Sequence, residues 1–316
     1  MKRLLIYFFY DKDGIVDDYI LYFLKSFRKY CQEICVVVNG NITEESKNDL
    51  KEITDFVLRK ENKGFDSWAY KYALEFYGYE KLKEFDEVIL ANFTMFGPIY
   101  SVEDFFNKTN AFNCDFWGIT LNSNENQKVL ETSIEEHIQS YFLVFRKKIL
   151  LSKDFMNYWI NLKMPNNYEE AIAFFELSCT KYFKEKGYKY LSYVEHQKYK
   201  EKLKKLPYFY YTFKQVKEDK MPFIKRKIFS TKNKTLEHPI EYGIKELFKY
   251  LKNNTTYDTS LITKNIKRSF DYNLTLSDAI KSYFYLTFKQ ITSPFRFMKY
   301  QRKKSLIIET LLLNKK

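Results

Sequence analysis

Short apolar segments alternate with amphipathic segments over the first 94 residues, and this alternation limits the fold more than any other feature of the chain. The apolar runs cover residues 3–10, 33–40, 55–60 and 86–94. Each run has the length of a strand, and the segments between them repeat apolar residues at helical spacing, as Ile20, Phe23 and Phe27 do. Strands that alternate with helices form parallel, doubly wound sheets. We therefore predict an α/β fold.

The second half of the predicted sheet is mixed. Residues 115–120 and 140–150 have the apolar pattern of strands, with no full helix between them. Strands without a helical crossover are typical of antiparallel pairing. Two helices are then expected, over residues 152–163 and 168–188.

The positive charge is concentrated at the C-terminal end of the chain. The net charge is +13, and residues 241–316 contain 15 Lys or Arg but only 6 Asp or Glu. Basic side chains interleaved with aromatic ones can contact anionic lipid, nucleic acid or a phosphorylated substrate, because each offers dense negative charge. We predict one domain over residues 1–240 and a basic extension of amphipathic helices over residues 241–316.

The composition excludes several classes of protein. No apolar run approaches the roughly 18 to 20 residues that cross a bilayer, and the apolar start of the chain lacks the cleavage site of a signal peptide. The four cysteines are too few for a disulfide framework, and they do not have the spacing of a zinc site. We expect a protein of the reducing cytoplasm.

Polar residues follow each of the first three predicted strands. These clusters are residues 10–13, 39–41 and 61–66. The third contains Gly64, one of only 8 glycines, in a turn that must bend sharply or let a ligand approach closely. Asp66 or Ser67 could simply cap the helix that follows. Because ligands of such sheets bind at the carboxyl ends of the strands, three clusters together favour a shared ligand.

Several segments together resemble one family of proteins. They are "ENKGFDSWAY" (61–70), "VILANFTMFGPIY" (88–100), "CDFWGIT" (114–120), "HIQSYFLVFRK" (137–147), "FFELSCTKYFKEKGY" (174–188) and "MPFIKRK" (221–227). Their order and spacing resemble the rhamnan synthesis F protein family over residues 2–227. That family consists of bacterial glycosyltransferases with a GT-A-like fold, a Rossmann-like mixed sheet flanked by helices. The resemblance implies a nucleotide-sugar donor, dTDP-rhamnose, and an inverting transfer to a lipid-linked saccharide of rhamnan, O-antigen (lipopolysaccharide) or capsule biosynthesis.

The resemblance also implies a donor site. Its expected residues are Tyr10, Asp11, Asn39, Asn62, Gly64, Asp66, Asn92, Thr94, Lys225 and Arg226. The family has an Asn-Asp-Ser-like triplet where this chain has Asn92, Phe93 and Thr94, so the acid that would bind a metal is missing. Either Mg²⁺ or Mn²⁺ is held near Asn92 and Thr94 mainly by the diphosphate, or basic side chains replace the metal. We favour the second alternative.

Three residues are candidates for the base that accepts the proton of the acceptor hydroxyl. Asp115 is the first choice, because a Trp-Gly step follows it and the resemblance places it on the acceptor side of the cleft. Glu176 and His137 come next, although a helical Glu between Phe residues or a lone His can equally be structural. Candidate contacts to the acceptor are Gln139 and Ser140, which could hold the sugar hydroxyls or orient a neighbouring side chain, and Trp117 and Tyr141, which could stack on a sugar ring.

The leading prediction is a nucleotide-sugar-dependent hexosyltransferase at the inner face of the cell membrane. Residues 293–308 could lie on anionic headgroups, or the extension could form a cap over the domain. Phe93 in place of an acid keeps open a catalytically silent scaffold of a polysaccharide assembly complex. A nucleic-acid-binding protein is a weaker alternative, because the chain has no recognised binding signature, and we expect no nucleic acid partner.

Overall fold

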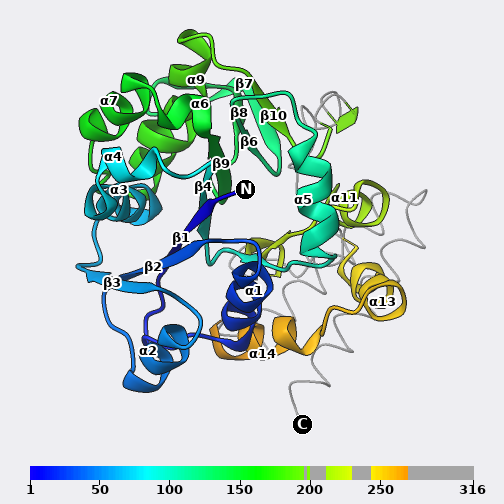
Figure 1. The fold of residues 1–316 in the computed structure, drawn as a ribbon. Coiled ribbons are helices and arrows are strands. Elements are labelled where there is room, and N and C mark those ends of the chain that lie inside the picture. Colours follow the sequence, from blue (N-terminus) through cyan, green and yellow to red (C-terminus); the bar gives the residue numbers. More distant parts are fainter. Residues whose placement is uncertain (196–197, 200–210, 230–242, 270–316) are drawn as a thin grey trace.

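A seven-stranded sheet forms the centre of the protein (Figure 1). The computed structural model describes residues 1–195, 198–199, 211–229 and 243–269. Neighbouring strands follow the order β10-β6-β9-β4-β1-β2-β3. Their bounds are β1 Arg3–Phe9, β2 Glu33–Asn39, β3 Phe56–Lys60, β4 Glu87–Asn92, β6 Phe116–Gly118, β9 Phe142–Arg146 and β10 Tyr190–Ser192.

The sheet is parallel in its first half and mixed in its second half. β3, β2, β1 and β4 run parallel, whereas β9 runs antiparallel to both of its neighbours, β4 and β6, and β10 runs parallel to β6. The predicted α/β class and the mixed sheet flanked by helices are confirmed. The carboxyl ends of the parallel strands and the amino end of β9 therefore meet at one end of the sheet, which we call the site end.

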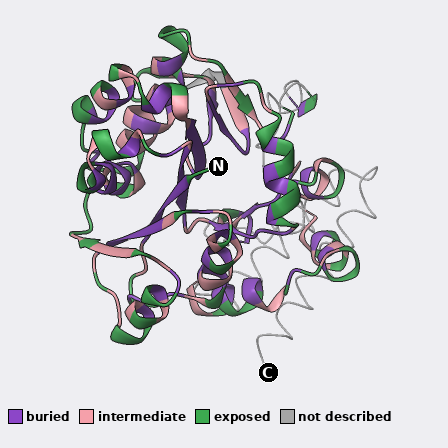
Figure 2. Ribbon diagram, in the orientation of Figure 1, coloured by how far each residue is buried: buried purple, intermediate pink, exposed green. Residues whose placement is uncertain are grey.

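Helices cover both faces of the sheet (Figure 1), and the central strands β1, β2, β4 and β9 are buried, whereas the edge strands β3 and β10 are partly exposed (Figure 2). Side chains of β1 alternate between two hydrophobic cores, with Leu5 and Tyr7 in the first and Leu4 and Ile6 in the second. Residues of α1 and α5 complete the first core, and residues of α3, α7 and α9 complete the second. The helices are α1 Asp18–Arg28, α2 Glu44–Lys51, α3 Phe65–Tyr77, α4 Tyr79–Leu82, α5 Val102–Asn110, α6 Lys147–Leu150, α7 Lys153–Asn161, α8 Tyr168–Ala171, α9 Ser178–Glu185, α11 Thr212–Asp219, α13 Ile244–Asn254 and α14 Ser260–Ser269.

Several small elements near the site end do not follow from the sequence pattern. They are the pair β5 Met95–Phe96 and β11 Ile224–Lys225, the hairpin β7 Leu121–Val129 and β8 Thr132–Ile138, the π-helical turn η1 Ile172–Leu177 and the 3₁₀ turn η3 Arg226–Phe229. The π turn divides the helix predicted over residues 168–188 into α8 and α9. Such turns insert one extra residue into a helix, and they often mark functional sites.

Helices α13 and α14 pack against the α/β domain. Leu247 and Leu251 of α13 and Ile262 of α14 are buried in the first core. The domain boundary at residue 241 stays a prediction, and the tail of residues 293–308 lies outside the described residues. Among the helices of the described ranges, none is both long enough and apolar enough to cross a membrane.

Arg268 fastens α14 to the segment that follows β1. Its Nη2 atom lies 2.7 Å from Asp11 Oδ2 and 2.6 Å from Asp17 Oδ2, and its Nε donates to Asp17 Oδ1 at 2.8 Å. Both carboxylates are largely buried, with side chains 12% and 14% exposed. The carboxylates of Asp11 and Asp17 thus form ion pairs with Arg268, which is about 250 positions away in the chain.

Arg268→Met should loosen the attachment of α14. The variant removes these hydrogen bonds and leaves two largely buried carboxylates without the guanidinium, so we expect a loss of about 1–3 kcal/mol in the free energy of unfolding. Amide hydrogen exchange over residues 260–269 should become faster, and mass spectrometry measures it. Lys267→Met, at the exposed neighbouring position, is the control. Equal exchange rates in the two variants would contradict this role of Arg268.

Candidate active site

The turn between β3 and α3 places Asp66 at the site end. Gly64 has a φ of 75°, and a Cβ there would lie 2.4 Å from Trp68 Cβ, so only glycine fits. Phe65 also has a positive φ, 53°, which is rare for a bulky residue. Backbone strain of this kind persists mainly at functional sites. Asp66 follows in the first turn of α3, where its Oδ1 accepts a hydrogen bond from Ser67 N–H at 2.9 Å.

Asn92 is the last residue of β4 and the first residue of the triplet that was expected to bind a metal. It forms a hydrogen bond with the turn before α3. Its Nδ2 donates to Asp66 Oδ2 at 3.0 Å. Its Oδ1 accepts from the backbone N–H of Thr94 at 3.1 Å and from Thr94 Oγ1 at 2.6 Å. Both ends of the amide are therefore engaged, and Asn92 holds Asp66 in position.

Glu176 lies on the π turn η1 and faces the start of β9. Its Oε2 accepts hydrogen bonds from the N–H of Ser140 at 3.0 Å and from Ser140 Oγ at 2.7 Å. His137 Nε2 lies 3.6 Å from Glu176 Oε1, which is longer than a hydrogen bond. His137 Nδ1 lies 2.7 Å from the carbonyl oxygen of Glu135, which only accepts, so Nδ1 carries a proton.

Lys225, on strand β11, lies close to Glu176 and Asp66 although it is distant from Asp66 in the sequence. The short strand β11 pairs with β5, directly after the Asn92 triplet, and the N–H of Arg226 donates to the carbonyl oxygen of Thr94 at 2.8 Å. Lys225 Nζ lies 4.4 Å from the centre of the Tyr141 ring. Its charge interacts with those of Glu176 and Asp66. We call Asp66, Asn92, His137, Ser140, Glu176 and Lys225 the Lys225 cluster.

The two carboxyl groups of the Lys225 cluster differ in acidity. Burial and the negative charge of Glu176 raise the pKa of Asp66 to about 6. Burial also acts to raise the pKa of Glu176, but the approach of His137, the charge of Lys225 and the hydrogen bonds from Ser140 outweigh it and lower this pKa to about 2. Burial lowers the pKa of Lys225 to about 8, although both carboxylates oppose the shift. Near neutral pH the cluster thus combines a charged lysine, a fixed carboxylate and a carboxylate that readily accepts a proton.

The residues around Asn92 do not fit a tightly held divalent cation. Mg²⁺ and Mn²⁺ prefer several oxygen ligands, among them carboxylates. The oxygens of the triplet are neutral, and Asn92 Oδ1 is already occupied by Thr94. Within the described ranges, no group of three or more His, Cys, Asp or Glu side chains could hold a metal ion. Lys225 is a cation in the same cluster, and the replacement of a metal by a basic side chain stays a prediction.

The structure corrects two of the sequence-based expectations. Asp115 precedes β6 at the opposite end of the sheet, because Phe116 pairs with Phe145 and β6 runs parallel to β4. Its Oδ2 accepts from Lys189 N–H at 2.8 Å and lies 3.0 Å from Lys148 Nζ, so it is not on the acceptor side of the cleft. Trp117 is fully buried in the first core and cannot stack on a sugar ring.

The other expected acceptor residues lie at the site end but are mostly buried. Thr120 Oγ1 donates to Gln139 Oε1 at 2.8 Å and lies 3.0 Å from the Tyr141 hydroxyl. The exposed fractions are 3% for Gln139 and 4% for Tyr141. The Tyr141 ring contacts Lys225 Nζ. Neither Gln139 nor Tyr141 offers an exposed face on which a sugar could stack.

The remaining donor residues are spread along the same end of the sheet. Tyr10 packs edge-on against the Phe93 ring, and Asn39 is fully buried, with its Nδ2 at 3.4 Å from the carbonyl oxygen of Phe65. Asn62 is exposed. Asp11 is bound to Arg268, and Arg226 Nε donates to Asn265 Oδ1 at 3.0 Å. Asp11 and Arg226 are therefore engaged with α14.

The sequence did not point to Tyr168 as a neighbour of this site. Tyr168 is 61% exposed, and partial desolvation together with the charges of Glu176 and Asp66 raises the pKa of its hydroxyl. It begins α8, after Asn167 caps the helix through the N–H of Glu170. The capping residue was a usable signal for the start of the helix, but nothing local indicated that the helix lies beside Asp66.

The chain is similar in sequence to known proteins. A family model described as "Rhamnan synthesis protein F" matches residues 34–307. An uncharacterized protein of Sinorhizobium fredii is 23% identical over 155 residues, which is 49% of this chain. The match spans only 39% of that relative's length.

Two solved structures match parts of the chain with low TM-scores. A putative nucleotide-diphospho-sugar transferase from Desulfovibrio desulfuricans is 9% identical, with a TM-score of 0.32 over 61% of this chain and 80% of that one. Core-mannan synthase A from Aspergillus fumigatus, in a Mn/GDP form, is 10% identical, with a TM-score of 0.31 over 57% of this chain and 72% of that one.

Proposed function

Because the chain belongs to the rhamnan synthesis protein F family, a family of glycosyltransferases, we propose that it transfers rhamnose from dTDP-rhamnose to a lipid-linked saccharide of a bacterial cell-surface polysaccharide. The observation that carries this proposal is the Lys225 cluster. It combines one half-buried lysine with two carboxylates of different acidity at the site end of a GT-A-like sheet. Sugar transfer from a nucleotide diphosphate needs both a cation for the leaving group and a base for the acceptor.

Lys225 is proposed to meet the charge of the leaving diphosphate. As the bond between the anomeric carbon and the diphosphate oxygen breaks, the electron pair stays on that oxygen and negative charge develops there. A half-buried ammonium group that is already in place stabilises this charge without the reorganisation that water would need. Glu176 keeps Lys225 protonated and is itself held by Ser140.

Asp66 is proposed to accept the proton of the acceptor hydroxyl. In an inverting transfer, the acceptor oxygen forms its bond to the anomeric carbon opposite to the leaving diphosphate, and its proton passes to a carboxylate. A base is most effective when its pKa lies near the working pH, so a pKa of about 6 suits Asp66 better than a pKa of about 2 suits Glu176. Pairs of carboxylates whose environments separate their pKa values commonly divide catalytic roles in this way.

Thermal unfolding in the presence of nucleotide sugars tests the donor. At a concentration of 100 times its dissociation constant, dTDP-rhamnose should stabilise the fold by about 2.7 kcal/mol. UDP-glucose and GDP-mannose should stabilise it less, and EDTA should leave the effect of dTDP-rhamnose unchanged if Lys225 takes the place of a metal. Absence of stabilisation by every nucleotide sugar, with or without Mn²⁺, would reject the donor site.

A catalytically silent scaffold is the second candidate, and the Asn-Phe-Thr triplet supports it. The two functions differ in turnover. Transfer to a rhamnose-terminated lipid acceptor, or slow hydrolysis of dTDP-rhamnose, would establish an enzyme. Stabilisation by the donor without either reaction would favour the scaffold.

The proposed acceptor places the enzyme at the cytoplasmic face of the membrane. The sequence offers the basic aromatic segment of residues 293–308 for contact with anionic headgroups. Flotation with anionic vesicles, for the full chain and for a chain that ends at residue 292, measures this contact. Equal flotation of the two chains would show that residues 293–308 do not bind the membrane.

A further inference from the structure

Asn265 of α14 is fully buried and connects two charged groups that are far apart in the sequence. Its Oδ1 accepts a hydrogen bond from Arg226 Nε at 3.0 Å, and its Nδ2 donates to Asp17 Oδ2 at 2.5 Å. Because a guanidinium only donates and a carboxylate only accepts, these two partners fix the orientation of the amide. Asp17 directly precedes α1, so the buried amide joins the start of α1 to the segment that carries Arg226.

Arg226 connects α14 with the backbone around Lys225. The N–H of Arg226 donates to the carbonyl oxygen of Thr94 at 2.8 Å, and its Nη1 lies 3.4 Å from the carbonyl oxygen of Phe93. Its Cζ atom lies 5.4 Å from the centre of the Tyr19 ring and 5.5 Å from the centre of the Phe93 ring. Arg226 directly follows Lys225, the last residue of β11. A side chain of α14 therefore holds the residue next to Lys225.

We propose that Asn265 is a positioning residue for sugar transfer, because it holds Arg226 and thereby keeps the neighbouring Lys225 in place. The inference rests on the proposed function, in which Lys225 meets the charge of the leaving diphosphate. Arg226 then acts through Lys225, whereas the resemblance implied that Arg226 contacts the donor. The inference also makes α14 a part of the catalytic domain, although the sequence predicted that this domain ends at residue 240.

The rest of α14 is attached to the domain independently of Asn265. Ile262 and Ile266 are buried in the first core, and Arg268 forms the ion pairs described above. Loss of the hydrogen bond at Asn265 should therefore release Arg226 and leave α14 in place. The effect on the site can thus be measured without detaching the helix.

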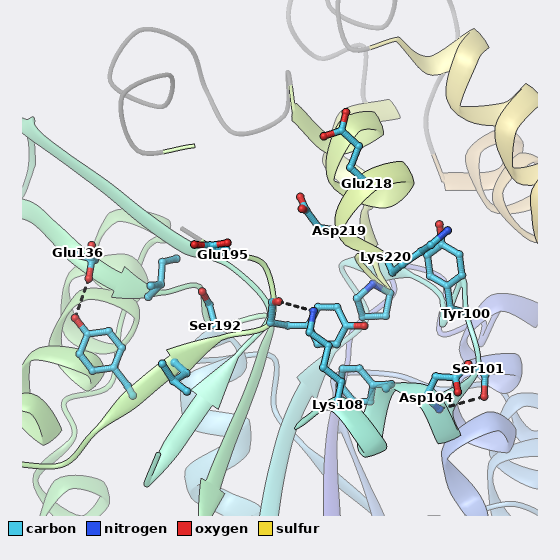
Figure 3. A pocket seen from close by; sticks show the side chains of 16 residues that line it. Tyr100, Ser101, Asp104, Lys108, Glu136, Ser192, Glu195, Glu218, Asp219 and Lys220 are labelled. Carbon is cyan, nitrogen blue, oxygen red and sulfur yellow. Dashed lines mark hydrogen bonds between the residues drawn. The ribbon is translucent and has the colours of Figure 1, made fainter. Parts of the chain in front are cut away.

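A cavity of about 1080 Å³ between α5, β10 and the end of α11 supplies a control that does not involve α14 (Figure 3). Neither Arg226 nor Asn265 is among the residues that line it. Lys108 of α5 lines the cavity, and its Nζ donates to the carbonyl oxygen of Tyr193 at 3.1 Å. Lys108→Met removes this hydrogen bond between two segments of the domain. It should leave kcat/KM and its pH dependence as in the wild type.

Asn265→Ala in the full chain should lower kcat/KM for transfer from dTDP-rhamnose about tenfold, because even a small displacement of a reacting group is costly. The decline of kcat/KM at high pH should also move from about 8 towards 10.5. Desolvation is the main cause of the lowered pKa of Lys225, and a loosened strand exposes its ammonium group to water. The other charged groups around it, Glu176, Asp66 and Lys227, are unchanged in this variant. A merely structural role of Asn265 would lower the free energy of unfolding without moving the decline.

Arg226→Met is a second variant, at a position that is only half-buried. It should move the decline towards higher pH in the same way as Asn265→Ala, because it breaks the same connection. A direct contact between Arg226 and the diphosphate predicts a different result, namely a loss of stabilisation by dTDP-rhamnose while the decline stays near pH 8. That result would overturn the proposal.

Asn265→Asp combined with Asp17→Asn tests whether the hydrogen bonds are the cause. The exchange keeps the total charge, reverses donor and acceptor between the two side chains, and retains an acceptor for Arg226. It should recover part of the activity that Asn265→Ala loses. If the exchange variant is as impaired as Asn265→Ala, the hydrogen bonds of Asn265 are not the cause and the proposal is wrong.

Lys225→Met distinguishes a failure of this inference from a failure of the proposed function. If Lys225→Met transfers sugar like the wild type, Lys225 has no part in the reaction and the proposed function fails. If Lys225→Met is impaired but Asn265→Ala has the activity and the pH dependence of the wild type, only this inference fails. It also fails if Asn265→Ala is more active than the wild type, because α14 would then restrain the site.

Discussion

Replacing Lys225 with methionine should lower kcat/KM for sugar transfer by about 10²–10³-fold, the loss found when one preorganised group that stabilises the charge of a transition state is removed. Methionine retains most of the apolar volume of the side chain over the Tyr141 ring but removes the charge. Steady-state kinetics with dTDP-rhamnose and a saccharide acceptor measure the effect. Lys249→Met, at an exposed position of α13, is the control and should have the activity of the wild type.

The pH dependence of kcat/KM tests whether the activity depends on the positive charge of Lys225. The pKa of Lys225 is lowered from 10.5 to about 8, so the wild-type kcat/KM should fall as the pH rises through about 8 and the ammonium group loses its proton. Lys225→Arg keeps a positive charge, and it should recover part of the activity and move this decline above pH 10. A decline near pH 8 that persists in Lys225→Arg would show that another group titrates there.

The same pKa shift has a consequence for stability. Between about pH 8 and pH 10.5 the unfolded chain binds more protons at this position than the folded one, so the free energy of unfolding contributed by Lys225 rises with pH over this range. Lys225→Met should abolish that rise. Chemical denaturation at pH 8 and pH 10 measures both slopes.

The sequence predicted those features that depend on local patterns. The apolar runs before Tyr10, Asn39 and Asn92 are the buried parallel strands, and parallel strands bring their carboxyl ends together. Gly64 indicated a special turn, and the structure confirms a left-handed backbone there. Asp66 and Asn92 could thus be expected as neighbours without knowledge of the tertiary structure.

The errors arose where strand direction and distant contacts decide the outcome. Asp115 precedes a strand of only three residues, and Trp117 is the middle residue of that strand; the sequence shows neither the direction of the strand nor which face is buried. Because β6 runs parallel to β4, the residues at the site end are those after Gly118, such as Thr120. The contact between Arg268 and Asp11 joins residues that are 257 positions apart, and no local pattern reports such a pairing.

Asp66→Asn should lower kcat by about 10²–10⁴-fold, the usual contribution of a positioned base. The change preserves the size of the side chain, and stabilisation by dTDP-rhamnose should remain. In the wild type, kcat/KM should rise as the pH increases through about 6, because Asp66 must lose its proton to act. The residual activity of the variant should lack this rise. Glu61→Gln, an exposed acid in the same turn, should retain both the activity and the rise.

The free energy of unfolding of Asp66→Asn should also depend on pH differently from that of the wild type. A Glu176→Gln variant tests the alternative that Glu176 is the base. The pKa of Asp66 is raised from 3.8 to about 6, so the folded state binds more protons between these values and the contribution of Asp66 to stability falls as the pH rises through them. Asp66→Asn removes that fall, so its stability relative to the wild type should increase between pH 4 and pH 7. Glu176→Gln should instead weaken the hold on Lys225 and Ser140. It should keep the rise in kcat/KM but move it below pH 6, because the negative charge of Glu176 helps to raise the pKa of Asp66. If Glu176→Gln abolishes that rise and Asp66→Asn does not, then Glu176 is the base and Asp66 positions the donor.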